Sequence, residues 1–186
     1  LSNTEFSSSA IAAYSTCHRI EHLFFIPIIS LATSMVTLIG MFYGAKKNHL
    51  LNNLIYFALK VSISISIIYA VFFLAFSENI LSLFTNDNKI ISIGVGYFDI
   101  FAFAIPFISI GMTCSRAMQG LGKAYPMFII TCLRVIVISC CLGYYFINIL
   151  NKPIDYAWIA ILISCMISAI ISFIWLISIK SRMNIN

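Results

Sequence analysis

Charged residues are scarce in this chain of 186 residues. They make up 9 % of the sequence, whereas apolar residues make up 61 %. Soluble domains typically carry roughly 25 % charged residues. With so little polar surface, the chain cannot bury its apolar side chains in one water-soluble core, so the lipid bilayer has to act as its solvent. The composition therefore indicates a polytopic membrane protein.

Sequence motifs of catalysis and metal binding are also missing. There is no P-loop, no GxSxG, no GxGxxG and no metal-ligand array. The six cysteines show no C-x-x-C spacing and lie in or beside apolar stretches, as expected of small buried thiols. The eleven basic residues lie mostly in short loops, so no basic face for nucleic acid is formed. The sequence predicts no enzyme, no catalytic residue, no metal, no cofactor and no nucleic-acid partner.

Five long apolar stretches fill almost the whole chain. Each is long enough to cross a bilayer as a helix, which needs about 20 apolar residues. We therefore predict an all-α membrane protein, with residues 1–186 forming a single transmembrane domain. The predicted spans are residues 10–43, 54–76, 90–114, 125–149 and 156–179. A sixth segment, 77–87, is too short to span and suits a short helix in the membrane interface.

The loops between the predicted spans differ in charge. Three segments on one side hold six Lys and Arg residues, and two on the other side hold two. The basic side contains Lys46, Lys47, Arg116, Lys123, Lys180 and Arg182. The positive-inside rule then places the C-terminus in the cytoplasm and the N-terminus outside. Because Leu1 is not followed by a signal peptide, an outside N-terminus suggests a preceding span, and we expect a chain truncated at its front.

One acid lies well inside a predicted span. Asp99 recurs at intervals of seven residues with Ser92, Pro106 and Thr113, and seven residues are nearly two helical turns. We expect these residues to form one stripe that faces the interior of the bundle, with Pro106 bending the helix. A carboxyl group beside a bend could couple proton or cation movement to a conformational change. A structural acid that pairs with a neighbouring helix is the alternative.

One base lies inside the next predicted span. Arg134 follows Lys123 by eleven residues and is too deep to reach the membrane surface easily, so we expect it to point inward. A guanidinium keeps its charge and could hold an anion, bind backbone carbonyls or pair with an acid. A pair with Asp99 would need helix tilt and a long reach.

A short polar cluster lies near the outer end of the first span. Its sequence HRIEH, residues 18–22, matches the H-x-x-E-H pattern of inverted zinc peptidases, and His18, Glu21 and His22 share one helical face. A zinc peptidase would need a third ligand and a cleft for substrate. A polar helix end that lines a vestibule is the simpler interpretation, which makes Glu21 a candidate cavity residue.

Several sequence blocks resemble one family of transporters. These are AAY, RIE, F-x-P and LIGMFYGAKK within residues 12–47, SRAMQGLGKAYP at 115–126 and LR at 133–134. Together they resemble the C-terminal lobe, about helices eight to twelve, of multidrug and toxic compound extrusion (MATE) transporters. The resemblance covers essentially the whole chain. The related polysaccharide and lipid flippases are a second, weaker match.

The resemblance implies a function. Members of this family have two six-helix lobes around a central cavity in the plasma membrane, and exchange H⁺ or Na⁺ for organic, often cationic, compounds. The chain would then be a fragment of a xenobiotic antiporter that is inactive alone, and its partners would be the lipid bilayer, the missing N-terminal lobe and a small organic substrate. Residues 1–9 would be an outer loop. A small membrane scaffold or regulatory subunit is the alternative function.

The sequence departs from the family at one position. Some branches carry an acid about eleven residues before the arginine that corresponds to Arg116, and this chain has Ile105 there. The family's ion site is therefore not carried over to Asp99. The candidate ion-coupling or cavity residues are Asp99, Arg134, Glu21, Pro106 and Thr113.

Overall fold

The computed structural model describes residues 2–145 and 155–183, and in these ranges it contains helices and no strand. The helices are α1 (Ser2–Gly44), α2 (Asn48–Ser82), α3 (Asn88–Gly120), α4 (Tyr125–Cys132), the π-helix η1 (Leu133–Ser139), α5 (Cys140–Tyr144) and α6 (Asp155–Arg182). Because α4, η1 and α5 follow one another without a break, the described chain has five helical segments long and apolar enough to cross a membrane. The predicted fold class is confirmed.

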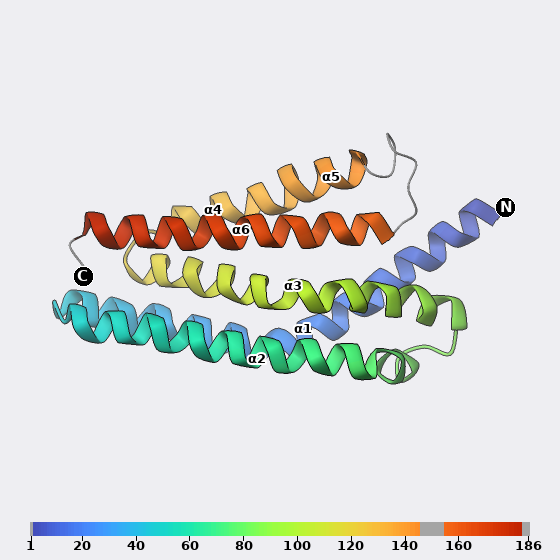
Figure 1. The fold of residues 1–186 in the computed structure, drawn as a ribbon, viewed down its shortest axis with the longest axis horizontal. Coiled ribbons are helices and arrows are strands. Elements are labelled where there is room, and N and C mark those ends of the chain that lie inside the picture. Colours follow the sequence, from blue (N-terminus) through green and yellow to red (C-terminus); the bar gives the residue numbers. More distant parts are fainter. Residues whose placement is uncertain (1, 146–154, 184–186) are drawn as a thin grey trace.

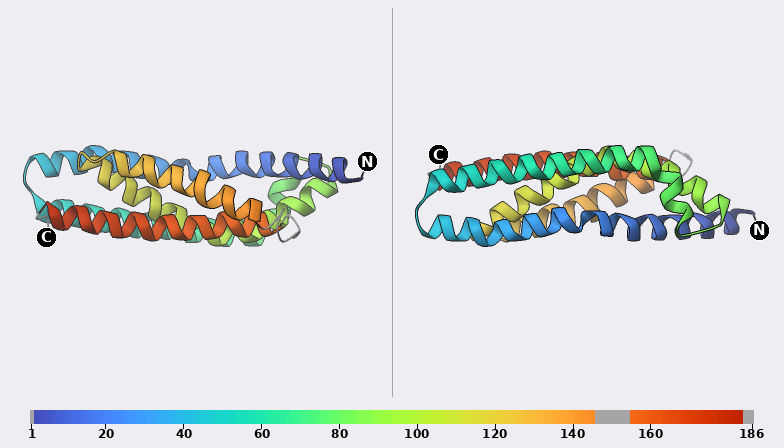
Figure 2. Two further views of the ribbon diagram at one scale, coloured as in Figure 1. Left: turned by 90° about the horizontal axis from the view of Figure 1, so that it is seen from above. Right: turned by 90° about the horizontal axis from the view of Figure 1, so that it is seen from below.

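Helix α3 lies at the centre of the bundle. It packs against α1 and α2 on one side and against α6 on the other (Figure 1). The segment α4–η1–α5 lies beyond α6 and crosses the bundle at an angle (Figure 2). This fourth span has the fewest buried residues of the five. It is thus the most loosely packed wall of the lobe.

The first helix begins earlier than predicted. Residues 2–9 continue α1 as a helix, so the expectation that they form an outer loop is wrong. The stretch from Ser2 to Ile26 contains neither proline nor glycine, so nothing in it interrupts the helical hydrogen bonds. The end of the fourth predicted span (146–149) and the loop at 151–154 lie outside the described residues.

The segment predicted as an interfacial helix is a bent end of α2. The backbone leaves helical geometry at Phe76, with φ −129° and ψ 16°, and resumes the helix up to Ser82. Ile80 and Leu81 turn into the core, whereas Leu83 and Phe84 remain exposed. The segment therefore closes one end of the bundle with one apolar side and presents the other to its surroundings.

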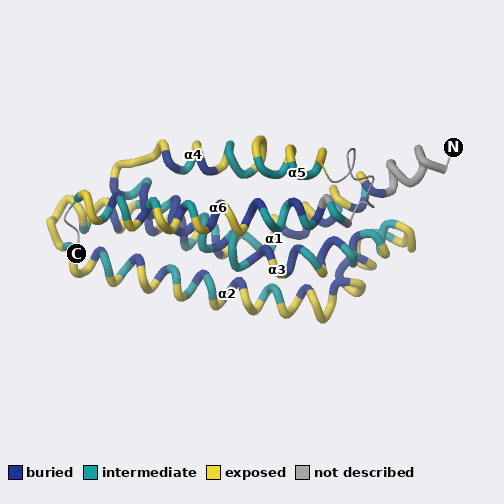
Figure 3. The backbone as a smooth tube through the Cα atoms, turned by 45° about the horizontal axis from the view of Figure 1, so that its top comes forward, coloured by how far each residue is buried: buried dark blue, intermediate teal, exposed yellow. Residues whose placement is uncertain are grey.

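Small side chains bring the helices close together. Ser164, Ser168 and Ser172 form a buried row along α6. A Cβ built on Gly111 of α3 would lie 3.7 Å from the Cα of Ala169 and 3.8 Å from the Oγ of Ser172. Apolar surface gives helices no hydrophobic driving force to associate in lipid. Close van der Waals packing at small residues stabilises their association instead. The exposed residues lie on the outward faces of the helices (Figure 3), and many of them have large apolar side chains.

The basic segments lie at one end of the bundle. The turn between α1 and α2, the loop between α3 and α4 and the end of α6 meet there (Figure 1). The loop between α2 and α3, which holds Asp87, lies at the opposite end, where Asp87 caps α3 by accepting a 2.9 Å hydrogen bond from the Lys89 amide. For the segments that the structure describes, the charge asymmetry expected from the loops is therefore an asymmetry of the folded bundle.

Candidate functional site

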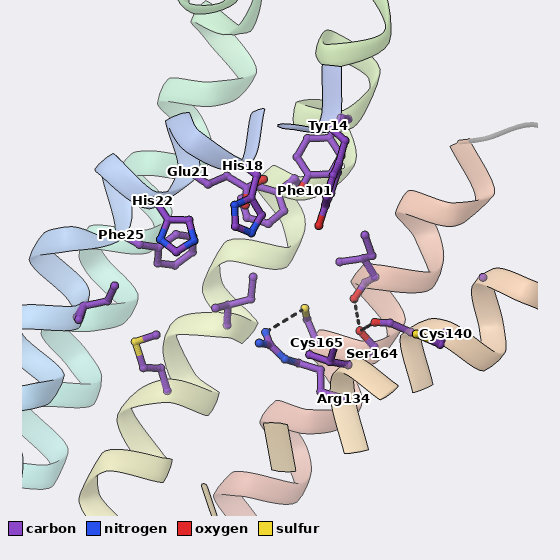
Figure 4. A pocket seen from close by; sticks show the side chains of 18 residues that line it. Tyr14, His18, Glu21, His22, Phe25, Phe101, Arg134, Cys140, Ser164 and Cys165 are labelled. Carbon is purple, nitrogen blue, oxygen red and sulfur yellow. Dashed lines mark hydrogen bonds between the residues drawn. The ribbon is translucent and has the colours of Figure 1, made fainter. Parts of the chain in front are cut away.

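A cavity of about 520 Å³ opens between α1, α3, α6 and the fourth span. Its size falls within the range of small-molecule sites, which is roughly 300–1,000 Å³. The walls are mainly apolar, with polar groups gathered on two opposing sides (Figure 4).

The α1 wall carries an acid and two imidazoles. Tyr14, His18, Glu21 and Phe25 recur every three or four residues, and His22 follows Glu21 directly. All five lie on one helical face directed into the cavity (Figure 4). Ring centroids of His18 and His22 lie 4.6 Å apart. The predicted shared face of His18, Glu21 and His22 is confirmed. Among the described residues, however, no group of three or more histidines, cysteines or acids is arranged to hold a metal ion.

Glu21 is the most buried polar group of this wall. Its side chain is 7 % exposed, and its Oε1 has no hydrogen-bond partner in the described part of the chain. The carboxyl group lies within hydrogen-bonding reach of the Tyr97 hydroxyl from α3. A buried carboxylate with an unsatisfied oxygen is costly, so this site is prepared for a proton, a cation or a hydrogen-bond donor.

Aromatic rings close the end of the cavity beside Glu21. Tyr14 and Trp158 stack with their planes 7° apart and centroids at 5.8 Å, and Tyr97 meets Trp158 edge-on at 4.9 Å. Tyr97 also stacks on Phe101 with centroids 5.3 Å apart. Three helices, α1, α3 and α6, contribute these rings. Of these rings, Tyr14, Tyr97 and Phe101 line the cavity, where they form an apolar, electron-rich surface suited to a flat or cationic organic group.

The opposite wall carries the base. Arg134 belongs to η1, and its guanidinium points into the cavity toward Cys165 of α6, with Nη1 3.9 Å from the sulfur (Figure 4). Among the described residues, this is the one hydrogen bond of the Arg134 side chain. Beside it, Ser139 donates to Ser164 at 2.8 Å and joins η1 to α6. Short π-helical segments are often found at functional sites, and here one carries the only arginine on the described cavity walls.

Arg134 also lines a second, smaller cavity of about 90 Å³. Hydroxyl groups of Ser115, Thr131 and Ser168 lie on its walls. Ile108 and Met112 are shared by both cavities. The arginine therefore forms part of the partition between a large cavity and a small one, partly lined by hydroxyl groups, that has room for a few water molecules.

The five candidate residues separate into two groups. Glu21 and Arg134 lie on the walls of one cavity, and Asp99, Pro106 and Thr113 are not among the residues that line it. Thr113 is buried between α2 and α3, where its hydroxyl donates to Ser62 at 3.0 Å. Pro106 lies inside α3, and its carbonyl accepts a 2.8 Å hydrogen bond from Ser109.

Asp99 does not face the interior of the lobe. Its side chain is exposed, whereas Tyr97, Phe98 and Phe101 around it are buried. The expected orientation is wrong, and so is the single stripe, which runs from exposed Ser92 to buried Thr113. The physical reason is rotation: a straight helix drifts by about 20° per heptad, so three intervals turn one end of the stripe away from the other. Whether Asp99 couples ion movement stays a prediction.

Several residues of the site had no signal in the sequence. Tyr97, Ser139, Cys140, Ser164 and Cys165 sit in runs of apolar or small residues, on helices that are apolar on every side. Nothing in their spacing distinguishes the side that faces a cavity from the side that faces lipid. The aromatic rings were equally hidden, since the chain holds sixteen Phe and nine Tyr.

The family is decided by a match to a family model. The model described as MatE matches residues 2–145, which is more than half of the chain. The chain belongs to the MatE family. The resemblance inferred from the sequence blocks is confirmed, and the matched region contains both Glu21 and Arg134.

Relatives of this MatE chain include proteins named as probable multidrug resistance protein NorM. The one from Thermotoga maritima is 23 % identical over 175 residues, which are 92 % of this chain and 37 % of that protein. The one from Bacillus cereus is 22 % identical over 185 residues, which are 98 % of this chain and 40 % of that protein. The chain therefore spans about two fifths of the length of the curated relatives it matches.

Solved structures agree with this assignment. An outward-facing multidrug resistance MATE transporter of the MOP superfamily superposes with a TM-score of 0.86 at 25 % identity, over 95 % of this chain and 39 % of that one. A MOP superfamily transporter from Pyrococcus furiosus superposes with a TM-score of 0.85 at 25 % identity, over 97 % of this chain and 41 % of that one. The MatE chain has the fold of a lobe-sized part of these transporters.

Proposed function

We propose that this chain forms one half of the translocation pathway of a multidrug efflux antiporter. It would export small organic, mainly cationic, xenobiotics across the plasma membrane in exchange for H⁺ or Na⁺, with its C-terminus in the cytoplasm. Membership of the MatE family and the names of the relatives support the class of function. The basic end of the bundle supports the orientation.

The observation that carries the proposal is Glu21. An antiporter needs a group that holds the substrate and the coupling ion at different stages, and a carboxylate inside the bilayer is the usual kind of group. Glu21 is buried, has an unpartnered oxygen and lines the large cavity beside the aromatic rings. An organic cation and a proton or Na⁺ could therefore compete for one carboxylate.

Because the chain spans about two fifths of its relatives' length, we expect no efflux from the chain alone. Two halves of a transporter rock around a shared site, and a single lobe has nothing to rock against. The test compares dye efflux in a pump-deficient bacterial strain that expresses either the 186-residue chain or the same chain with its native genomic sequence on both sides. We expect export in the second case only.

The substitution Glu21→Gln makes this test specific. It keeps size and hydrogen bonding but removes the exchangeable charge, so export should fall to background at unchanged membrane expression. Glu78→Gln is the matched control, since Glu78 is exposed near the end of α2 and lies outside the cavity lining. Full export in the Glu21→Gln variant would refute the proposal. In cells that express the native protein, collapsing the H⁺ and Na⁺ gradients separately would identify the coupling ion.

The length of the chain keeps a second function open. A scaffold or regulatory subunit that packs against a complete transporter would also span a fraction of its relatives' length. Such a subunit would carry its own start codon and ribosome site and would co-purify with a larger partner. A reading frame that continues upstream into seven more spans would exclude it.

A further inference from the structure

A third cavity, of about 310 Å³, is a groove between α2 and α6. Both helices pack against α3 (Figure 1), but in the described ranges no pair of Cα atoms within 8 Å joins α2 to α6. The two helices therefore form the walls of the groove, and α3 forms its floor. It shares no lining residue with the other two cavities. Every lining side chain is apolar, and the set includes Leu59 and Ile63 of α2, Phe107 and Ile110 of α3, and Phe173 and Ile174 of α6.

The α2–α6 groove lies within the membrane-spanning part of the lobe, in the half nearer the basic loops. Ile110 precedes the end of α3 by ten residues, which is about 15 Å of helix, and Ile174 precedes the end of α6 by eight residues, which is about 12 Å. The hydrocarbon core of a bilayer is about 30 Å thick. The groove is therefore at the depth of the acyl chains of one leaflet, and the exposed rings and methyl groups of its α6 wall are in their reach.

Two lysines stand at the end of the groove that is nearer the basic loops. Lys60 follows Leu59 directly and is exposed, and Lys180 follows Phe173 by seven residues, nearly two turns along the same face of α6. Helical side chains lean toward the N-terminus of their helix. Because α2 begins at the basic end and α6 ends there, Lys60 leans out toward the basic end and Lys180 leans back toward the groove. The exposed Tyr56, one turn before Leu59, adds a hydroxyl group beside them.

The helices that form this mouth offer no acid to the two lysines. The sequence contains no Asp or Glu in residues 22–77, 100–154 and 156–186, and the basic end of the bundle is built from these ranges. The counter-charge for Lys60 and Lys180 therefore has to come from outside these segments. An anionic phospholipid supplies both a phosphate for the lysines and acyl chains for the groove, and basic pockets between membrane helices bind such headgroups. A phosphatidylcholine headgroup brings its own cation, which the lysines repel.

We propose that the α2–α6 groove binds one anionic phospholipid, with an acyl chain between the two helices and the headgroup phosphate held by Lys60 and Lys180. Tyr56 donates a hydrogen bond to the same phosphate. The bound lipid fills the space between two helices that do not pack on each other, and so links α2 to α6. The site lies apart from the large cavity, and its role is separate from the binding of an exported compound.

The test is native mass spectrometry of the purified 186-residue chain in detergent. The chain is titrated with phosphatidylglycerol or with phosphatidylcholine, both carrying the same acyl chains. We expect one retained lipid per chain, and binding of phosphatidylglycerol about tenfold or more tightly than phosphatidylcholine. Each lysine near an anionic headgroup contributes about fivefold to this preference.

Lysine variants locate the headgroup. Lys60→Gln and Lys180→Gln should each weaken binding of phosphatidylglycerol about fivefold and leave binding of phosphatidylcholine unchanged. Lys123→Gln is the matched control, because it removes the same charge from an exposed loop at the same end of the bundle. That variant should bind both lipids as the native chain does.

A second pair of variants locates the acyl chain. Ile63→Trp should fill the groove and weaken binding of both lipids several-fold. Ile67→Trp adds the same bulk one turn further along α2, at an exposed position outside the groove lining, and should leave both affinities unchanged. Circular dichroism checks that each variant keeps its helices.

Equal binding of the two lipids by the native chain would overturn the inference, even if a lysine variant failed to fold. A preference that falls as much in Lys123→Gln as in Lys60→Gln would assign it to the general charge of the basic end, and would also overturn it. A dimer that stays free of lipid at saturating phosphatidylglycerol would place a second copy of the chain in the groove instead. None of these outcomes changes the expectation for Glu21→Gln, so the inference and the proposed function fail independently.

Discussion

Gly120 of α3 lies directly against Ile39 of α1. A Cβ at position 120 would lie 2.8 Å from the Cβ of Ile39, and 2.9 Å from the carbonyl oxygen of Val36. Both neighbouring atoms belong to or adjoin the backbone of α1, so they cannot move aside as the end of a flexible side chain could. The two helices therefore cross at this glycine, at the same end of the bundle as the basic loops.

Gly120→Ala should push α1 and α3 apart and destabilise the lobe by about 2 kcal/mol, as overpacking of a close contact commonly does. Thermal unfolding in detergent, followed by circular dichroism, measures the effect. Gly96→Ala is the matched control in the same helix, because a Cβ there would meet nothing within 4 Å. That variant should be neutral or slightly stabilising, since alanine favours a helix over glycine. Equal stability of both variants would contradict the crossing.

Thr113→Val should weaken the contact between α2 and α3. The substitution removes the 3.0 Å hydrogen bond from Thr113 to the buried Ser62 hydroxyl while keeping the shape of the side chain. We expect a loss of about 1 kcal/mol, which is typical of a hydrogen bond between helices in a membrane. Thr131→Val should cost less, because Thr131 is exposed and, among the described residues, its hydroxyl bonds only to the carbonyl of Met127. A chemical unfolding series distinguishes the two.

Two neighbouring cysteines report whether the cavity holds water. Cys140 and Cys141 are both exposed, but only Cys140 lines the large cavity. In variants that keep one of these cysteines and replace the others by serine or alanine, a polar, membrane-impermeant thiol reagent should modify Cys140 quickly. Cys141 should react slowly, because a thiol in hydrocarbon is out of reach of such a reagent. Mass spectrometry of the labelled chain gives the rates. Equal rates would place both thiols in the same environment.

The substitution Asp99→Asn distinguishes a role in ion coupling from a role in ligand binding. Because Asp99 does not line the cavity, the variant should bind a cationic dye as the native chain does. We still expect it to reduce ion-coupled efflux, since a carboxylate on the exposed face of α3 would be costly against lipid and needs a polar neighbour there. Native efflux in this variant would show that Asp99 has no role in transport. Weakened dye binding would contradict its placement outside the cavity lining.

The orientation in the membrane can be tested directly. A fluorescent protein that matures only in the cytoplasm, fused after Asn186, should give a signal, whereas alkaline phosphatase fused there should stay inactive. Placing the same reporters in the α2–α3 loop beside Asp87 should give the reverse result. The opposite pattern at both sites would invert the proposed orientation.

The sequence by itself determined the helical spans, the family and the presence of two charges, Glu21 and Arg134, inside those spans. Length and hydropathy are enough to define membrane helices, because backbone hydrogen bonds must be satisfied within each span. An acid or a base such as Glu21 or Arg134 stands out in an apolar run because its burial is costly.

Only the tertiary structure decided which side of each helix faces the core, the cavity or the lipid. In these spans apolar residues surround the whole helix, so periodicity does not reveal the buried side, and Asp99 was assigned to the wrong one. The meeting of Tyr14, Tyr97 and Trp158 depends on how α1, α3 and α6 cross. Crossing is set by contacts between small residues far apart in sequence, such as Gly111 with Ser172. No local pattern encodes those contacts, and for that reason the opposition of Glu21 and Arg134 across one cavity emerged only in the fold.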